Sequence, residues 1–216
     1  MVYDDPPSAV AKKQGVRKIE KMGGISKETR RELLVASPYF IPNDEIMGNL
    51  RALTDRGVSV KVLTNSLASN DVGMVHAGYM RYREDLLAGG VELYEFRAVR
   101  NVELEEQLGR NKIDSDKASL HAKFFGFDSR YLFVGSFNLD ARSAVWNTEL
   151  GAYFESPPEA RLLSAVFDDG IMQFAYRLEL DDEGELTWVT LDENGTEVIV
   201  DHEPDTTFWK RFNTRI

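Results

Sequence analysis

Short apolar segments alternate with longer amphipathic ones along the first half of the chain. Three of the apolar segments, each bounded by proline, glycine or polar residues, predict buried strands at 32–39, 58–64 and 91–96. Two amphipathic segments predict helices, one from Asn43 or Asp44 to Arg56 and one over about 71–88. Strands that alternate with helices in this way are typical of a layered α/β fold.

The second half of the chain carries consecutive strand patterns instead. Strands are predicted at 120–127, 131–137 and 148–156, the first two joined by a turn at 128–130. An amphipathic helix from Pro157 to about Tyr176 follows, then a hairpin with Asn194-Gly195 at its turn and a short helix that begins at Thr206. Residues 97–118 are charged and lack periodicity, which predicts a surface loop. The whole pattern predicts an α/β fold in which helices flank a mixed β-sheet.

The composition is that of an ordinary globular protein. The 216 residues are 43% hydrophobic and 29% charged, enough for one domain with a substantial core. There is no cysteine, which excludes disulfides, a thiolate metal site and a cysteine nucleophile. No run of 18 apolar residues occurs, and the N-terminus lacks the apolar core of a signal peptide. We therefore expect neither a membrane-spanning helix nor an export signal.

The charge of the chain is acidic overall but uneven. A net charge of −10 argues against a non-specific nucleic-acid binder, so no nucleic-acid partner is expected. Residues 1–28 are polar and contain Pro6-Pro7 and Gly23-Gly24, which predicts a linker or arm. Basic side chains concentrate at residues 12–31, either as a solvated leader or as a segment that lies near anionic lipid head groups.

One stretch of the second half combines side chains that carry chemistry. If 120–127 is a strand, His121 and Lys123 share one of its faces, about 6.5–7 Å apart. The pattern H-x-K-x4-D-x6-G-S-x-N specifies six residues: His121, Lys123, Asp128, Gly135, Ser136 and Asn138. It resembles the HKD motif of the phospholipase D superfamily. That family also places a glutamate on the next strand, where this sequence has Glu149.

The wider chain narrows the resemblance. Several segments resemble the second catalytic half of bacterial cardiolipin synthases, especially the C-type branch: SPYFIP, LTNSLASNDVGMVHAGY, LLAGGVELYEF and NLDARSAVWNTELG. Full-length members of that family have two HKD motifs, whereas this chain has one. The resemblance implies an arm at 1–28 derived from the junction between the halves, a catalytic half at 29–180 and a C-terminal extension at 181–216.

The resemblance also implies a role for each motif residue. Phosphodiester chemistry of this kind uses one imidazole as the nucleophile that forms a phosphohistidine and a second as the acid for the leaving alkoxide. His121 supplies one of these roles, and which one stays open. Lys123 is expected to stabilise the phosphoryl oxygens as a cation, with Asn138 and Ser136 as hydrogen-bond donors. Glu149 is expected to orient a histidine ring, and Gly135 to allow close backbone approach.

Other candidate residues have less specific signals. Asp128 adjoins the hairpin turn, so within the motif it is interpreted as structural. His76 suits either packing or a place at the mouth of the pocket, and His202 is interpreted as structural. Tyr39 and Phe40 suit either the core or the lining of a lipid site. Trp188, Phe208 and Trp209 suit either attachment of the tail or contact with a membrane. The three histidines show no metal-ligand spacing, so neither a metal nor another cofactor is expected.

The resemblance therefore implies a phosphatidyltransferase of the phospholipase D type, similar to cardiolipin synthases, that supplies one of two HKD motifs. Its expected partners are a phospholipid such as phosphatidylglycerol, a membrane surface, and either the missing half or a second copy of the chain. It is expected in a bacterium, in the cytoplasm or peripherally on a membrane. Two alternatives stay open: a single-motif phosphodiesterase or nuclease that acts as a homodimer, and an isolated half without activity.

Overall fold

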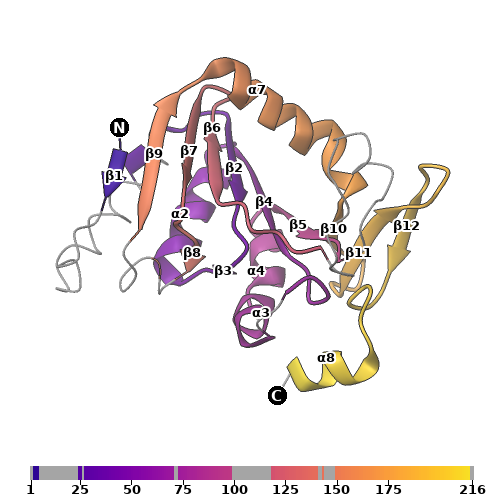
Figure 1. The fold of residues 1–216 in the computed structure, drawn as a ribbon. Helices are drawn as coiled ribbons and strands as arrows, with labels where there is room; N and C mark the ends of the chain where they lie inside the picture. Colours follow the sequence, from indigo (N-terminus) through magenta and orange to yellow (C-terminus); the bar gives the residue numbers. More distant parts are fainter. Residues whose placement is uncertain are drawn as a thin grey trace.

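A computed structural model describes residues 2–4, 24–25, 27–70, 73–98, 118–140, 143 and 149–214. Within this part of the chain, ten strands form one mixed sheet in the order β1-β9-β7-β6-β2-β4-β5-β10-β11-β12 (Figure 1). β2 (Glu32–Ala36), β4 (Ser59–Asn65) and β5 (Val91–Phe96) are parallel neighbours. The expected α/β fold with a mixed sheet is confirmed.

The remaining strands of the sheet pair in antiparallel fashion on either side of this parallel centre. One side contains β6 (Phe124–Phe127), β7 (Tyr131–Gly135), β9 (Leu150–Glu155) and β1 (Val2–Asp4). The other side contains β10 (Ala175–Leu180), β11 (Leu186–Leu191) and β12 (Glu197–Val200). β3 (Phe40–Ile41) and β8 (Leu139–Asp140) form a separate two-stranded parallel pair.

Helices cover the two faces of the sheet. One face packs against α2 (Asp44–Thr54), α3 (Gly73–Met80) and α4 (Arg83–Ala88), with Val35, Val62 and Leu93 in the shared core. The other face packs against α7 (Pro157–Ala165) and its continuation, a π-helical turn at Val166–Gly170 and a 3-10 turn at Ile171–Gln173. Adjacent residues of β2 point into opposite cores, because side chains alternate along a strand.

Local signals explain several of the element boundaries. The side chain of Asn43 accepts a hydrogen bond from Ile46 N at 2.9 Å and caps α2. Gly57 follows α2 with φ of 77°, a conformation that favours glycine. Two prolines occupy the first turn of α7, where a missing N–H costs no helical hydrogen bond. The predicted hairpin turns at 128–130 and at Asn194-Gly195 are both present.

The predicted strand at 120–127 is too long. β6 begins at Phe124, so His121 and Lys123 do not lie on a face of a regular strand. The reason is that β2, the neighbour of β6, ends at Ala36 just before Pro38. The side chain of Asn65 instead bonds both backbone groups of Leu120, at 2.8 Å from Leu120 N and 3.1 Å from Leu120 O.

Two predicted helices are also wrong in extent. The helix predicted from Pro157 to Tyr176 stops at Gln173, because the following residues pair with β5 as strand β10. The helix predicted over 71–88 is two helices, α3 and α4, separated by a turn at 81–82. The first strand is also shorter than predicted and ends at Ala36.

The sheet includes strands from the predicted arm and from the predicted extension. β1, from the predicted arm, pairs with β9, while β11 and β12, from the predicted extension, continue the sheet beyond β10. The last described element is α8 (Phe208–Thr214), which packs against α3. Most of the loop predicted at 97–118 lies outside the described residues. The division into arm, catalytic half and extension stays a prediction.

Candidate active site

The motif residues surround an open pocket of about 690 Å³ at the end of the sheet where β6 begins and β7 ends. Ten residues line it: Tyr39, His121, Lys123, Val134, Gly135, Ser136, Asn138, Leu150, Gly151 and Ala152. The sequence analysis named six of these ten as candidates. The structure therefore brings together all the motif residues except Asp128, and Glu149 lies beside Leu150 in the wall.

His121 is an exposed residue on an irregular segment that strand pairing does not hold. Its position depends on the preceding residue, because Asn65 at the end of β4 binds the backbone of Leu120. Lys123 Nζ donates to the carbonyl oxygen of His121 at 3.1 Å. An exposed imidazole at the mouth of a pocket is free to meet a second group or a substrate.

Asn65 is a positioning residue that the sequence analysis did not single out. It is 1% exposed, and Ser69 Oγ donates to its side-chain oxygen at 3.0 Å. The sequence feature that could have identified Asn65 is its place as a polar residue at the carboxyl end of a predicted buried strand. Ligands of α/β sheets bind at that end of parallel strands. If 120–127 were a regular strand, its neighbouring strands would hold Leu120, so the prediction required no side chain to do so.

Lys123 has an altered ionisation because it is partly buried. Burial lowers the pKa of the Lys123 ammonium, and the negative charge of Glu149 opposes this change. Lys123 therefore brings a partly desolvated positive charge to the pocket, as expected for binding phosphoryl oxygens.

Ser136 and Glu149 form a closely bonded pair in the pocket wall. The hydroxyl of Ser136 donates to the carboxylate of Glu149 and accepts from Leu150 N at 3.0 Å, while Ser136 N donates to Leu150 O at 2.8 Å. Glu149 is 8% exposed. Ser136 therefore bonds the carboxylate in this state, and a direct contact with phosphate stays a prediction.

Gly135 and Asn138 shape the rest of the pocket. A Cβ atom on Gly135 would lie 2.4 Å from Leu150 O and 2.8 Å from the Cα of Gly151, so a larger residue would push β7 and β9 apart. Asn138 is 8% exposed, and its Oδ1 has no hydrogen-bond partner among the described residues. A buried amide oxygen without such a partner can accept a hydrogen bond from a ligand or from a docked protein.

Asp128 lies at the far end of β6 from His121. Its carboxylate accepts hydrogen bonds from the backbone N–H groups of Arg30, Arg31 and Glu32, at 2.8–3.2 Å. These bonds hold the start of β2 against the hairpin turn. The contacts support the structural interpretation of this motif residue.

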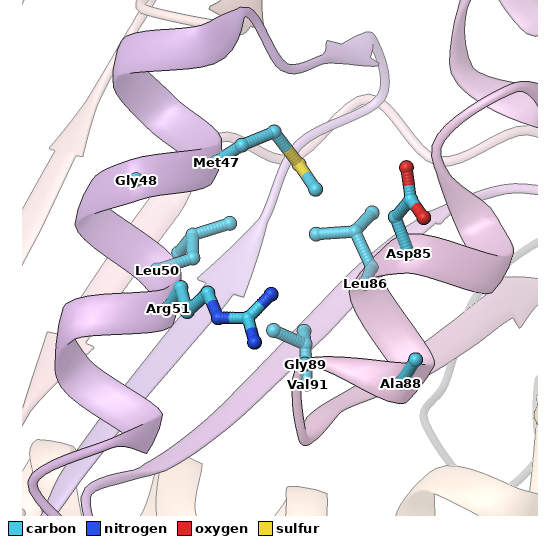
Figure 2. Close-up of a pocket in the computed structure, with 9 residues that line it drawn as sticks. All are labelled: Met47, Gly48, Leu50, Arg51, Asp85, Leu86, Ala88, Gly89 and Val91. Atoms are coloured by element: carbon cyan, nitrogen blue, oxygen red, sulfur yellow. The ribbon is translucent and has the colours of Figure 1, made fainter.

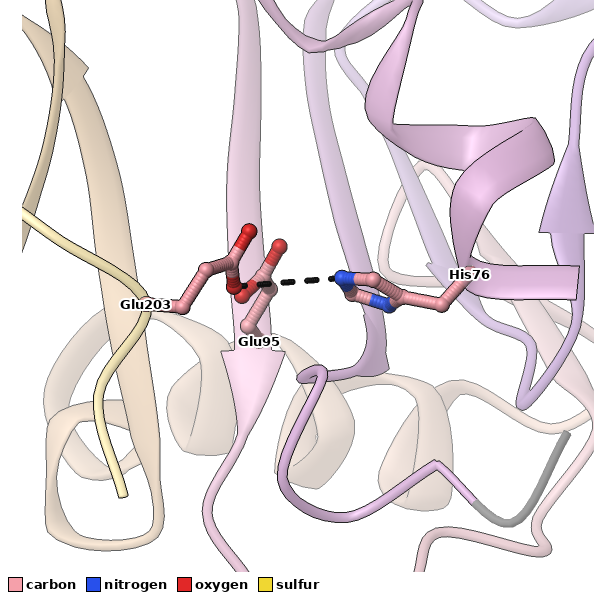
Figure 3. Close-up of side chains that lie close together, drawn as sticks. All are labelled: His76, Glu95 and Glu203. Atoms are coloured by element: carbon pink, nitrogen blue, oxygen red, sulfur yellow. Dashed lines mark ion pairs between the residues drawn. The ribbon is translucent and has the colours of Figure 1, made fainter. Parts of the chain in front are cut away.

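A second group of ionisable side chains is buried away from the pocket (Figure 3). The possible ligand atoms of His76, Glu95 and Glu203 lie within 4.8 Å of one another. The guanidinium of Arg83 contacts both carboxylates, at 3.3 Å from Glu95 and 2.6 Å from Glu203. The cluster therefore already contains a cation. Its sequence signal was Glu95, which shares the inner face of β5 with Val91 and Leu93.

The structure also places several candidates whose sequence signals were less specific. His76 is 1% exposed and packs in the cluster instead of lining the pocket, while His202 is exposed and pairs with Asp201. Trp188 is buried and donates to Glu95 at 2.9 Å. Phe40 is buried in the core, whereas Tyr39 lines the pocket.

A smaller hollow of about 320 Å³ lies between α2 and α4 (Figure 2). Apolar side chains such as Met47, Leu50 and Leu86 form much of its lining, with Arg51 and Asp85 as its charged groups. It contains no histidine, serine or asparagine. The pocket at His121 is therefore the site with the groups that phosphoryl chemistry needs.

The family profile described as "Cardiolipin synthase, PLD-like domain" matches residues 25–170, more than half of the chain. The chain belongs to this family. It is 37% identical to Cardiolipin synthase C of Escherichia coli over its whole length, which is 46% of that relative. It is 26% identical to Probable cardiolipin synthase YwiE of Bacillus subtilis over 67% of its length, which is 25% of that relative. The chain thus spans less than half of each of these two curated relatives.

Two solved structures share the fold of this chain. A phospholipase D family member, Nuc from Salmonella typhimurium, has a TM-score of 0.54 and 18% identity, over 82% of this chain and 97% of that chain. The phosphatidylserine synthase of Haemophilus influenzae has a TM-score of 0.53 and 15% identity, over 75% of this chain and 37% of that chain. The expected phospholipase D-like architecture is confirmed by these likenesses.

Among the residues that the structure describes, no helix is both long and apolar enough to cross a bilayer.

Proposed function

We propose that this chain is one catalytic half of a phospholipase D-type phosphatidyltransferase, in which His121 supplies one of two imidazoles. The supporting observation is that the exposed His121 and the partly desolvated Lys123 line one pocket together with Asn138. The family supports a phospholipid as the donor. Phosphatidylglycerol or a related hydroxyl compound is the proposed acceptor.

The proposed reaction proceeds in two displacements. A neutral imidazole nitrogen attacks phosphorus, the bond to the leaving alkoxide breaks, and a protonated second imidazole gives that oxygen its proton. The acceptor hydroxyl then attacks phosphorus, its proton passes to the second imidazole, and the phosphorus–nitrogen bond breaks. Lys123 stabilises charge on the phosphoryl oxygens in both steps.

The described pocket contains one of the two imidazoles. His76 is buried in its own cluster and His202 lies outside the pocket, so neither lines it beside His121. The second imidazole must come from another HKD half or from a second copy of this chain. A two-fold axis would bring two copies of His121 together, because it presents the same surface from each chain.

The decisive experiment is His121→Ala in a protein that holds both halves, with phosphatidylglycerol as donor and acceptor. Loss of an acid–base or nucleophilic imidazole lowers turnover roughly 100-fold or more. Unchanged thermal unfolding would show that the loss is chemical. Near-normal lipid product from the folded variant would refute the proposal.

The activity of the 216-residue chain by itself should follow its association state. We expect phosphodiester cleavage to rise with dimer content in sedimentation measurements made at the same concentrations. Robust turnover in a strictly monomeric sample would contradict the need for two imidazoles.

A further inference from the structure

Three aromatic side chains form an exposed cluster on α8. Phe208, Trp209 and Phe212 are 64%, 69% and 50% exposed. Their ring centroids lie 5.7–6.3 Å apart, so the three rings pack against one another at the surface of the molecule. A contiguous aromatic surface of this kind marks an interaction site.

The sequence of this segment is basic although the chain as a whole is acidic. Residues 206–216 contain Lys210, Arg211 and Arg215 and no Asp or Glu, whereas the whole chain has a net charge of −10. Of the acidic side chains just before the helix, Glu203 is buried against Arg83, and Asp205 is exposed but accepts a hydrogen bond from the hydroxyl of Tyr176. Aromatic rings beside lysine and arginine are the composition of helices that lie in the interface of an anionic bilayer.

The helix is bonded to the loop that follows β4. Lys210 Nζ donates to Ala68 O at 3.3 Å, in the loop that follows β4. The last residue of β4 is Asn65, which holds Leu120 and so positions His121. Figure 1 shows α8 beside α3, at the opposite end of the molecule from α7. The aromatic cluster and the His121 pocket are therefore linked through one loop.

We propose that the aromatic cluster of α8 binds an anionic phospholipid bilayer and so brings the His121 pocket to its lipid substrate. The advantage of this binding rests on the proposed phospholipid substrate. Whether the helix binds a bilayer is a separate property and is tested separately. A symmetric contact between two copies of α8 would place the basic residues of each helix against those of the other. The charge pattern thus favours a bilayer over a second copy.

The test is sedimentation of the chain with vesicles of phosphatidylglycerol and phosphatidylethanolamine. Trp209→Ser/Phe212→Ser should weaken the affinity for these vesicles about a hundredfold or more, because each side chain contributes at least about one factor of ten on burial. Leu162→Ser is the matched control, since Leu162 is 68% exposed on α7, at the other end of the molecule. Its binding should equal that of the unaltered chain.

Three further measurements separate the possible outcomes. Vesicles of phosphatidylcholine alone should bind more weakly, and added salt should weaken binding to the anionic vesicles. His121→Ala should bind like the unaltered chain, so a failure of the proposed reaction would not be mistaken for a failure of docking. Equal binding of Trp209→Ser/Phe212→Ser and the unaltered chain would overturn the proposal. So would a loss of self-association in this variant without any loss of vesicle binding.

Discussion

Replacing Arg83 with methionine should destabilise the fold more than any single change at the surface. The Arg83 side chain is 1% exposed and stands between Glu95 and Glu203, at 3.3 and 2.6 Å. Its guanidinium also lies 5.2 Å from the ring centre of Tyr79 and 5.4 Å from that of Trp188. Methionine keeps much of the apolar volume but leaves two buried carboxylates without their cation.

The expected cost is large because the remaining charges cannot reach water. Removal of one partner from a buried ion pair costs about 3–5 kcal/mol. For a chain of this size, each kcal/mol lowers Tm by roughly 2–4 °C, which predicts a loss of about 6–20 °C. An exposed pair is worth at most about 1 kcal/mol, so Arg130→Met should change Tm little. Arg130 pairs with Glu155, and these side chains are 56% and 49% exposed.

The pH dependence of Arg83→Met gives a second readout. In the unaltered protein, burial raises the pKa of Glu95 even though Arg83 opposes this. Without Arg83, the carboxylates keep protons in the folded state that they lose in the unfolded state. The folded variant then binds more protons, so its free energy of unfolding falls as pH rises above the ordinary glutamate range. The deficit should therefore be larger at pH 8 than at pH 5.

Urea unfolding of Arg83→Met, Arg130→Met and Arg83→Met/Glu203→Gln completes the test. The double variant should recover part of the loss, because Glu203→Gln removes one of the stranded charges. A finding that Arg83→Met is no less stable than Arg130→Met would refute the predicted cost of the stranded charges. A loss of stability in Arg83→Met that did not grow with pH would refute it as well.

The remaining predictions concern the pocket. Gly135→Ala should lower the free energy of unfolding in urea by about 1–3 kcal/mol or more, because its Cβ would meet backbone atoms. Gly48→Ala is the control and should be neutral or stabilising, because a Cβ there has nothing within 4 Å. Equal stability of the two variants would contradict the close approach of β7 and β9. The lowered pKa of Lys123 predicts that turnover declines at a lower pH than an ordinary lysine would allow. Lys123→Arg should shift this alkaline decline upward, and an unchanged pH profile would assign it to another group.

Much of the fold follows from local patterns in the sequence. The strands at 59–65 and 91–96 were predicted within a residue, because their apolar runs are bounded by Gly57, Gly89 and Gly90. The two hairpin turns were predicted because turn residues act within a few positions of themselves. The motif residues were likewise found by their spacing, and the pocket contains His121, Lys123, Ser136 and Asn138 as a group.

Tertiary structure decided the features that depend on partners distant in sequence. The helix was predicted to continue to about Tyr176, but Ala175 and Tyr176 pair with the edge of β5 and belong to strand β10. His121 lies on an irregular segment because β2 ends before it and Asn65, 55 residues away, binds Leu120. The cluster of Arg83, Glu95 and Glu203 joins three segments whose sequences show only isolated charges. Periodicity reports which face of an element is buried, whereas only the folded chain determines which distant groups that face meets.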